Sequence, residues 1–390
     1  MKNEDNISWI LNHLGEDREN YYNAVNPPMM LTSNFAFKTV GEMRKQLETE
    51  LQVPFYTRGY NPTVAILRKK LAALEGTEDA LVFSSGSAAV AAAVMSVVKS
   101  GDHVVCVQKP YSWTNTLISG YLSKYGVEST FVDASEEDEV FKAVQKNTRL
   151  IYLESPNSMT FEMQNISAIT NYAKSAGITT ILDNSYNSPL NQKPAAMGVD
   201  IVVHSATKYL NGHSDVIAGV VASTSARISK MMAEEYMTLG AVVSAHDAWL
   251  IIRGMRTLEL RVNRSSTSAQ QIAEWLEQNP KIEKVYYPTL KSNSQYKLAA
   301  QQMKQGGGLL TIQLKAKDVS EVESFCNALH CFLLATSWGG HESLMLPVCA
   351  LRASASLSSQ LPWNMIRVYI GLEDPQMLIQ DLEQALGKMN

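Results

Sequence analysis

Short apolar segments rich in β-branched residues recur through the middle of the chain, and helical stretches or loops separate most of them. Such runs, bounded by turn-forming residues, are typical of buried strands. Their alternation with helices predicts an α/β domain around a mostly parallel sheet. The expected strands lie at residues 80–83, 103–107, 150–153, 179–182, 201–203 and 216–222.

The region before these strands has little periodicity. Residues 1 to about 55 are irregular and contain three prolines, which interrupt regular structure. A helix is then expected from a cap at Thr63 to a stop at Gly76, with leucines at helical spacing between them.

The pattern changes again after about residue 253. An amphipathic helix is expected at residues 266–278, followed by a strand in GGLLTIQLKA and a last helix from about Pro375. These elements predict a smaller α+β domain. We therefore expect three parts, comprising residues 1–58, 59–252 and 253–390.

Composition and charge narrow the function classes. Of the 390 residues, 45% are hydrophobic and 18% are charged, as in ordinary globular proteins. The net charge is -4 and the sequence has no run of lysine or arginine. These values argue against nucleic acid or a membrane surface as a partner.

Targeting signals and cysteines point to the cytoplasm. The N-terminus lacks the basic start and apolar core of a secretory signal. The longest apolar run, at residues 88–98, is alanine-rich and too short to span a bilayer. None of the four cysteines forms a CxxC pair, so we expect reduced thiols and no metal site.

Three of the expected strands are followed by residues that could bind a ligand or take part in catalysis. In open α/β sheets, ligands bind at the carboxyl ends of the strands. In ALVFSSGSAAV, Gly86 lets the backbone approach a ligand, and the free N–H groups of the following helix can bind a phosphate. In TTILDNSYNSP, the strand delivers Asp183, a possible partner for a protonated ring nitrogen. Taken singly, a plain turn explains the first segment better, and a helix cap or an Asx turn explains the second better.

The third segment is DIVVHSATKYLNGHSD. Lys208 follows a buried strand, where desolvation lowers an amine pKa and allows a Schiff base with an aldehyde. Ser205 and Thr207 can donate hydrogen bonds to a phosphate. His204 and His213 have no partners at metal-ligand spacing, so we assign both to core or loop packing.

Together these segments resemble the Cys/Met-metabolism (trans-sulfuration) family of enzymes that use pyridoxal 5'-phosphate (PLP). The resemblance extends over nearly the whole chain, from YTRGYNPT through SATKYLNGHSD to IRVYIGLED. It implies an α/β fold of the aspartate-aminotransferase type (fold type I), with a large PLP-binding domain and a smaller C-terminal α+β domain. It also implies a carbon–sulfur lyase that acts on a small sulfur amino acid.

The resemblance assigns cofactor roles to individual residues. Lys208 is similar to the lysine that binds the cofactor and then moves protons, and Asp183 to the partner of the pyridine nitrogen. Tyr111, in KPYSWTN, is similar to the ring that stacks on the cofactor and assists proton transfer. The implied phosphate ligands are Gly86, Ser87, Ser205 and Thr207.

It also implies a shared active site. Tyr56 and Arg58 match a pair that reaches the phosphate of the neighbouring subunit, with Tyr56 also near the substrate. A homodimer is then obligatory, and family members are usually tetramers. Arg367 is similar to the arginine that binds the substrate α-carboxylate. Ser337 and Trp338 are the other implied substrate residues.

The choice of reaction is less clear. SWGG, with Trp338, and the block LESPNSMTFE, with Ser158, resemble cystathionine β-lyases. We therefore expect cleavage of cystathionine to homocysteine, pyruvate and ammonia, as in methionine biosynthesis. NPT at residues 61–63 instead resembles γ-lyases and γ-synthases, whereas Thr336 and Trp113 depart from cystathionine γ-lyases and methionine γ-lyases. Cystathionine γ-lyase, methionine γ-lyase and cystathionine γ-synthase therefore stay open, and so do an aminotransferase or a non-catalytic PLP-binding relative.

Overall fold

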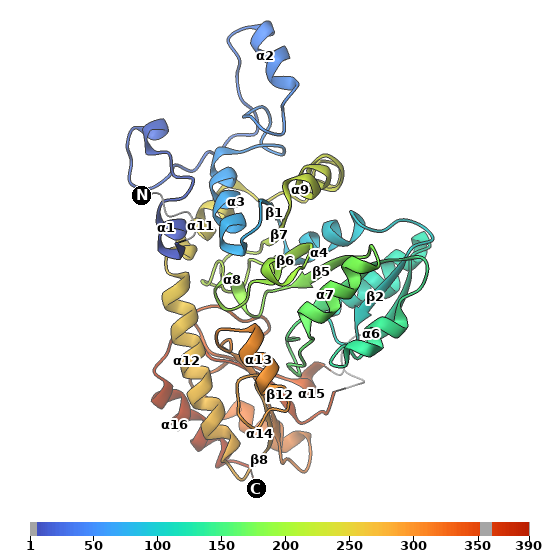
Figure 1. Cartoon of the computed structure of the whole chain (residues 1–390). Coiled ribbons are helices and arrows are strands. Elements are labelled where there is room, and N and C mark those ends of the chain that lie inside the picture. Colours follow the sequence, from blue (N-terminus) through green and yellow to red (C-terminus); the bar gives the residue numbers. More distant parts are fainter. Residues whose placement is uncertain (1–5, 352–360, 390) are drawn as a thin grey trace.

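The computed structural model describes residues 6–351 and 361–389, which form two parts with separate sheets. The long helix α12 (Leu258–Glu277) runs from the larger part down the side of the smaller one (Figure 1). Helix α2 (Val40–Leu47), in the N-terminal segment, stands away from both.

The larger part is built on a seven-stranded sheet in the order β1-β7-β6-β5-β4-β2-β3. β7 is antiparallel to both of its neighbours and the other pairs are parallel, which confirms the mostly parallel sheet. The strands are β1 (Asp79–Phe83), β2 (His103–Val107), β3 (Glu128–Val132), β4 (Thr148–Glu154), β5 (Thr179–Asp183), β6 (Ile201–Ser205) and β7 (Gly219–Ser223).

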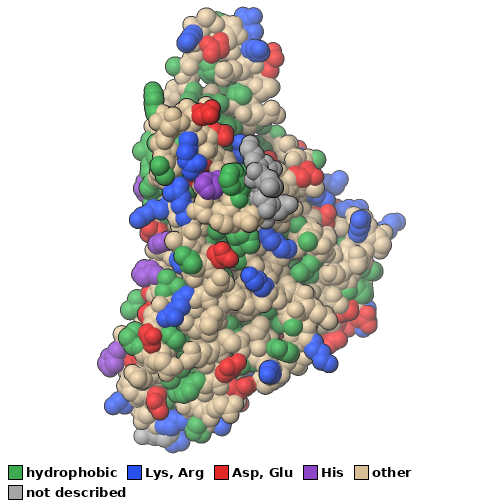
Figure 2. Space-filling view, turned by 60° about the vertical axis from the view of Figure 1, so that its left-hand side comes forward, with side chains coloured by type: hydrophobic (Ala, Val, Ile, Leu, Met, Phe, Trp, Pro, Cys, Tyr) green, Lys and Arg blue, Asp and Glu red, His purple; other side chains and the backbone are tan. Residues whose placement is uncertain are grey.

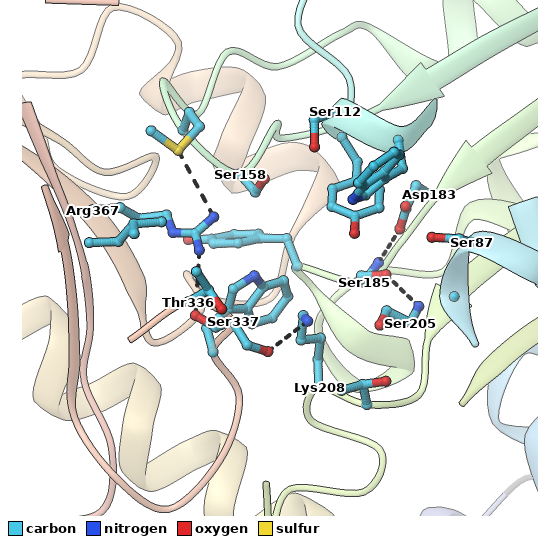
Figure 3. Close-up of a pocket in the computed structure, with 18 of the residues that line it drawn as sticks. Ser87, Ser112, Ser158, Asp183, Ser185, Ser205, Lys208, Thr336, Ser337 and Arg367 are labelled. Carbon is cyan, nitrogen blue, oxygen red and sulfur yellow. Dashed lines mark hydrogen bonds between the residues drawn. The ribbon is translucent and has the colours of Figure 1, made fainter. Parts of the chain in front are cut away.

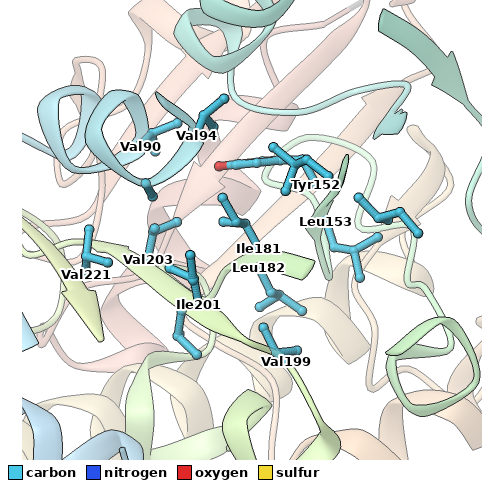
Figure 4. Packing of buried hydrophobic residues seen from close by; sticks show 14 of the residues in the cluster. Val90, Val94, Tyr152, Leu153, Ile181, Leu182, Val199, Ile201, Val203 and Val221 are labelled. Carbon is cyan, nitrogen blue, oxygen red and sulfur yellow. The ribbon is translucent and has the colours of Figure 1, made fainter. Parts of the chain in front are cut away.

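The helices of this part pack on both faces of the sheet. Alternate residues of β7 point to opposite faces: Val221 joins one core cluster, and Val220 and Ala222 join another. Figure 4 shows the first cluster, in which Val90 and Val94 of α4 lie over the buried strands. The helices are α3 (Pro62–Glu75), α4 (Gly86–Met95), α5 (Ser112–Asn115), α6 (Glu137–Ala143), α7 (Ile166–Ser175), α8 (Ser188–Asn191), α9 (Ser225–Met231), α10 (Met237–Leu239) and α11 (Ala245–Met255).

The smaller part has a five-stranded sheet in the order β10-β11-β12-β9-β8, antiparallel except between β10 and β11. A third core cluster, to which α12, α14 and α16 contribute, packs against it. Its strands are β8 (Ile282–Tyr286), β9 (Leu309–Leu314), β10 (Leu333–Leu334), β11 (Leu344–Pro347) and β12 (Met365–Tyr369). Its other helices are α13 (Tyr296–Gln302), α14 (Val319–Asn327), α15 (Val348–Leu351) and α16 (Pro375–Leu386).

Several expected boundaries were wrong. The cap of α3 is Asn61, whose Oδ1 accepts from the backbone N–H of Thr63 at 3.0 Å, and Pro62 takes the first helical position. Helix α12 begins at Leu258, eight residues before the expected start. The sequence pattern did not predict β3, because this edge strand is polar at its start and only partly buried.

The N-terminal segment includes α1 (Ile7–Asn12) and is anchored by a buried ion pair. Lys70 of α3 lies 3.1 Å from Glu16 and also donates to the carbonyl oxygens of Ile10 and Leu11. Beyond this anchor, several large apolar side chains of the segment are exposed. The expected divisions at residues 58 and 253 stay predictions.

The surface on the face shown in Figure 2 carries basic and acidic side chains interspersed with one another. Among the described residues, no helix combines the length and the apolar character needed to cross a membrane.

Candidate active site

A cavity of about 930 Å³ lies at the carboxyl ends of the parallel strands, and residues of the smaller part close one side of it (Figure 3). Strands β4, β5 and β6 end here, as expected for a ligand site in an open sheet. The cavity brings together ten of the twelve predicted site residues. These are Gly86, Ser87, Tyr111, Asp183, Ser205, Thr207, Lys208, Ser337, Trp338 and Arg367.

The turn between β1 and α4 forms a cup for an anion. Helix α4 begins at Gly86, and Ser85 caps it by accepting from Ala88 N at 3.1 Å. A Cβ atom on Gly86 would lie 3.0 Å from the Ser205 Cβ, so a larger residue would crowd the cup. The N–H groups of this first turn, together with Ser205, can therefore hold a phosphate.

Asp183 ends β5 at the floor of the cavity. Its Oδ1 accepts from the Ser185 N–H at 2.9 Å. Burial raises the pKa of Asp183, whereas the hydrogen bonds from Ser185 and the nearby His204 and Lys208 oppose this rise. Such a carboxylate can pair with a protonated ring nitrogen.

Lys208 reaches into the cavity from the loop after β6. Its Nζ donates to Ser337 Oγ at 2.7 Å and lies 5.7 Å from the centre of the Trp338 ring. Burial, helped by the charge of Arg367, lowers the pKa of Lys208 to about 8. A substantial neutral fraction of this amine is then present near neutral pH and can attack an aldehyde.

Arg367 projects into the cavity from the middle of β12. Its Nη2 lies 3.5 Å from the Ser337 carbonyl oxygen, and its Nη1 lies 3.9 Å from Met159 Sδ. Burial lowers the pKa of Arg367 to about 10, and it makes no ion pair with any carboxylate in the described part of the chain. Its guanidinium fork is therefore available to a carboxylate ligand.

Tyr111 lies at the mouth of the cavity, at the start of α5, and its side chain is 43% exposed. Burial of the hydroxyl and the charge of nearby Asp183 raise the pKa of Tyr111, and a hydrogen bond with Ser87 opposes them. The ring therefore lies over the same space as the anion cup. Trp113, two residues on, also lines the mouth and is 61% exposed.

Tyr56 and Arg58 do not line the cavity. Both are exposed in the N-terminal segment, with the Arg58 guanidinium 5.5 Å from the Tyr56 ring centre. Their predicted role concerns a neighbouring subunit, so it stays a prediction. The histidines behave as expected: His204 is buried against Glu75, and His213 bonds the Asn211 carbonyl oxygen.

Glu154 is absent from the residues predicted from the sequence. It ends β4 beside Asp183, lines the cavity and is buried. Burial, reinforced by the charge of Asp183, raises the pKa of Glu154 to about 8. The available signal was the same as for Asp183, namely an acidic residue at the end of an apolar strand.

These residues fit PLP. An amine with a lowered pKa, a carboxylate for the ring nitrogen, a helix N-terminus for the phosphate and an aromatic ring at the mouth all open on one cavity. Gly86 brings the first turn of α4 so close to Ser205 that a Cβ atom there would lie 3.0 Å from the Ser205 Cβ, which places the serine beside the helix N-terminus. Lys208, Asp183, Tyr111 and the anion cup would hold the cofactor.

Comparisons with known proteins agree with this chemistry. The family model for Cys/Met metabolism PLP-dependent enzymes matches residues 10–387. An L-methionine gamma-lyase of Fusobacterium nucleatum subsp. nucleatum is 38% identical and covers 95% of each chain. A cystathionine gamma-lyase of Bacillus subtilis is 37% identical over 85% of this chain and 88% of its own.

Two further comparisons add a relative with a different named activity and a solved structure. An L-alanine/L-glutamate racemase of Wolbachia pipientis is 34% identical, covering 97% of this chain and 96% of its own. The crystal structure of metB from Corynebacterium glutamicum matches with a TM-score of 0.92 and 33% identity, over 98% of both chains. The chain therefore belongs to the Cys/Met metabolism family of PLP-dependent enzymes, with pyridoxal phosphate as its cofactor.

Proposed function

We propose that the protein is a carbon–sulfur lyase that eliminates the γ-substituent of a sulfur amino acid, with L-methionine and L-cystathionine as the first candidates. The relatives named methionine and cystathionine γ-lyase support γ-elimination better than the β-elimination expected from the sequence. The β-lyase remains the second candidate because of SWGG and Ser158.

The observation that carries the proposal is the shared contact of Lys208 and Arg367 with Ser337. The Oγ of Ser337 accepts from Lys208 Nζ, and its carbonyl oxygen faces Arg367 Nη2. Figure 3 shows Ser337 between the two cationic side chains. One α-amino acid can therefore place its carboxylate on Arg367 and its α-carbon within reach of the lysine amine.

The residues of the site then have distinct tasks. When bound, pyridoxal phosphate supplies a ring that spreads the negative charge developing on the substrate. Asp183 would pair with the protonated nitrogen of that ring and keep it positively charged. Lys208, with its pKa lowered to about 8, would take the Cα proton, and γ-elimination also requires that a second proton be removed from Cβ. Arg367 holds the carboxylate so that the reacting bond stays aligned.

Two sequence blocks that favour different reactions have structural explanations. Asn61, in the NPT block, caps α3 and lies outside the cavity lining. Trp338, in SWGG, is buried, and its ring packs edge-on against Tyr209 at 5.4 Å between centres. Neither block by itself therefore assigns the bond that breaks.

We also propose that the active site is completed by a second copy of the chain. Tyr56 and Arg58 are exposed on a segment whose apolar side chains are uncovered in the monomer. The exposed residues include Tyr22, Val25, Leu31, Val40 and Leu47. A homodimer would bury them and could bring Arg58 to the phosphate of its partner.

Product analysis tests the reaction. The PLP-loaded protein is incubated with L-methionine or L-cystathionine, and the oxoacid and thiol are identified. γ-Elimination gives 2-oxobutyrate and ammonia, with methanethiol from methionine or cysteine from cystathionine. Pyruvate and homocysteine from cystathionine would establish β-elimination instead. Exchange or racemisation at Cα without any thiol would remove the lyase assignment.

A further inference from the structure

Glu154 joins the two loops that follow the neighbouring strands β2 and β4. Its Oε2 accepts from the backbone N–H of Tyr111 at 2.7 Å, and its Oε1 accepts from the backbone N–H of Ser158 at 3.2 Å. Tyr111 follows β2 and Ser158 follows β4, so one carboxylate holds together two segments that are 47 positions apart. Only 6% of this residue is exposed, so water competes little for these bonds.

Each loop carries a side chain that faces the ligand space. The first presents the Tyr111 ring at the mouth of the cavity. The second presents Met159, whose sulfur contacts Arg367 Nη1 at 3.9 Å. A shift of Glu154 would therefore move the aromatic ring and the surroundings of the guanidinium together.

Hydrogen bonds and charges around Glu154 offset part of the cost of burying its carboxyl group, although burial and Asp183 still raise its pKa. Arg367 faces it from β12 and is the nearby cation, whereas Asp183 lies directly opposite on β5. Cys106 of β2, Tyr152 of its own strand and the Tyr111 hydroxyl also face this region. Two backbone N–H donors and one guanidinium thus oppose the repulsion from Asp183.

We propose that Glu154 is a positioning residue that sets the Tyr111 ring against the bound cofactor and the Met159 loop against Arg367. It acts through these two loops and does not take part in proton transfer. This inference rests on the PLP site of the proposed function but not on which carbon–sulfur bond is broken.

The test uses the PLP-loaded Glu154→Gln variant, which keeps the size of the side chain. Its amide has one acceptor oxygen, so one of the two backbone N–H groups would face an NH₂ donor. We expect the visible circular dichroism of the bound cofactor to fall by at least about half, because this signal depends on the contacts of the ring. We expect kcat to fall about 10- to 100-fold, because one buried backbone N–H group loses its acceptor and the two loops shift, with a smaller change in KM.

Asp381→Asn is the matched control. Asp381 is also a buried carboxylate that accepts from two backbone N–H groups, those of His330 and Cys331, but it lies outside the cavity. This variant should lose thermal stability while its visible signal and kcat stay within about twofold of the parent.

The visible signal is read without any amino acid, so it remains informative even if the protein proves not to be a γ-lyase. If Glu154→Gln does not fold, Glu154→Asp is measured in the same way, since its shorter chain cannot reach both N–H groups. A parental visible signal and a kcat within twofold in the folded variant would overturn the proposal. Equal losses in Asp381→Asn would do so as well.

Discussion

Replacing Arg367 by methionine should greatly lower kcat/KM while leaving the free energy of unfolding almost unchanged. Methionine has a similar length and no donors. Among the described residues, the hydrogen-bond contacts of the Arg367 guanidinium are long, at 3.5 Å to the Ser337 carbonyl oxygen and 3.9 Å to Met159 Sδ. The surroundings therefore lose little when it is removed, whereas an anionic substrate loses its main partner.

The magnitudes follow from these contacts. A bidentate carboxylate would form two charge-assisted hydrogen bonds with Arg367, each contributing about 1.5–3 kcal/mol. Their loss should lower kcat/KM by about 10²- to 10⁴-fold. The free energy of unfolding of the apoprotein should change by less than about 1 kcal/mol, because the cost of burying the cation offsets most of what its long contacts contribute. The lowered pKa of Arg367 agrees with such a cost.

The assay combines kinetics of the PLP-loaded enzyme with urea unfolding of the apoprotein. Arg261→Met is the control, because Arg261 donates to the carbonyl oxygens of Tyr209 and Gly254 at 2.9 and 2.8 Å and to Thr257 Oγ1 at 3.1 Å. Its loss leaves buried acceptors unsatisfied and should cost about 3 kcal/mol. The reasoning fails if Arg367→Met keeps kcat/KM within tenfold, or if it destabilises the protein as much as Arg261→Met does.

Three other expectations follow. In the apoprotein, reductive trapping of Lys208 by an aldehyde and borohydride should increase with pH around a midpoint of about 8, since the pKa of this amine is lowered and only the neutral form attacks. A midpoint near the ordinary lysine pKa would contradict this expectation. The Lys208→Ala variant should show no such reaction. Asn61→Ala should lower the free energy of unfolding by about 1–2 kcal/mol through loss of the α3 cap, with the product unchanged; a switch of product would mean that NPT acts in the reaction. Mixed Arg58→Ala and Lys208→Ala chains should regain activity through hybrid dimers, whereas confirmed hybrids without activity would exclude a shared site.

The sequence predicted most clearly those elements whose burial is regular. Strands β2, β5 and β6 are short and rich in β-branched residues, so composition and length identified them. Helix α16 begins at the expected Pro375, where Asp374 caps it. The edge strand β3 and the first turns of α12 carry polar residues, and only tertiary contacts decide their structure.

The site could be predicted where a motif places chemistry next to a strand end, as for Asp183 and Lys208. Contacts between distant segments could not be predicted. The hydrogen bond between Lys208 and Ser337 spans 129 positions, and the bond between Tyr111 and Glu154 spans 43 positions and depends on how β2 and β4 align. Nothing local in the sequence distinguishes Glu154 from an exposed acidic residue at the end of a strand.

The dependence of the site on contacts between distant segments also explains why the sequence motifs did not distinguish β-elimination from γ-elimination. β- and γ-Elimination share the removal of the Cα proton, and the γ-reaction needs a second removal one carbon further along. The outcome therefore depends on how far the amine of Lys208 can travel. In the structure this amine is bonded to Ser337 and lies beside the Trp338 ring and the charge of Arg367, all contributed by the smaller part of the molecule. We therefore expect the choice between the two reactions to respond to substitutions in the smaller part more than to changes in the larger sheet.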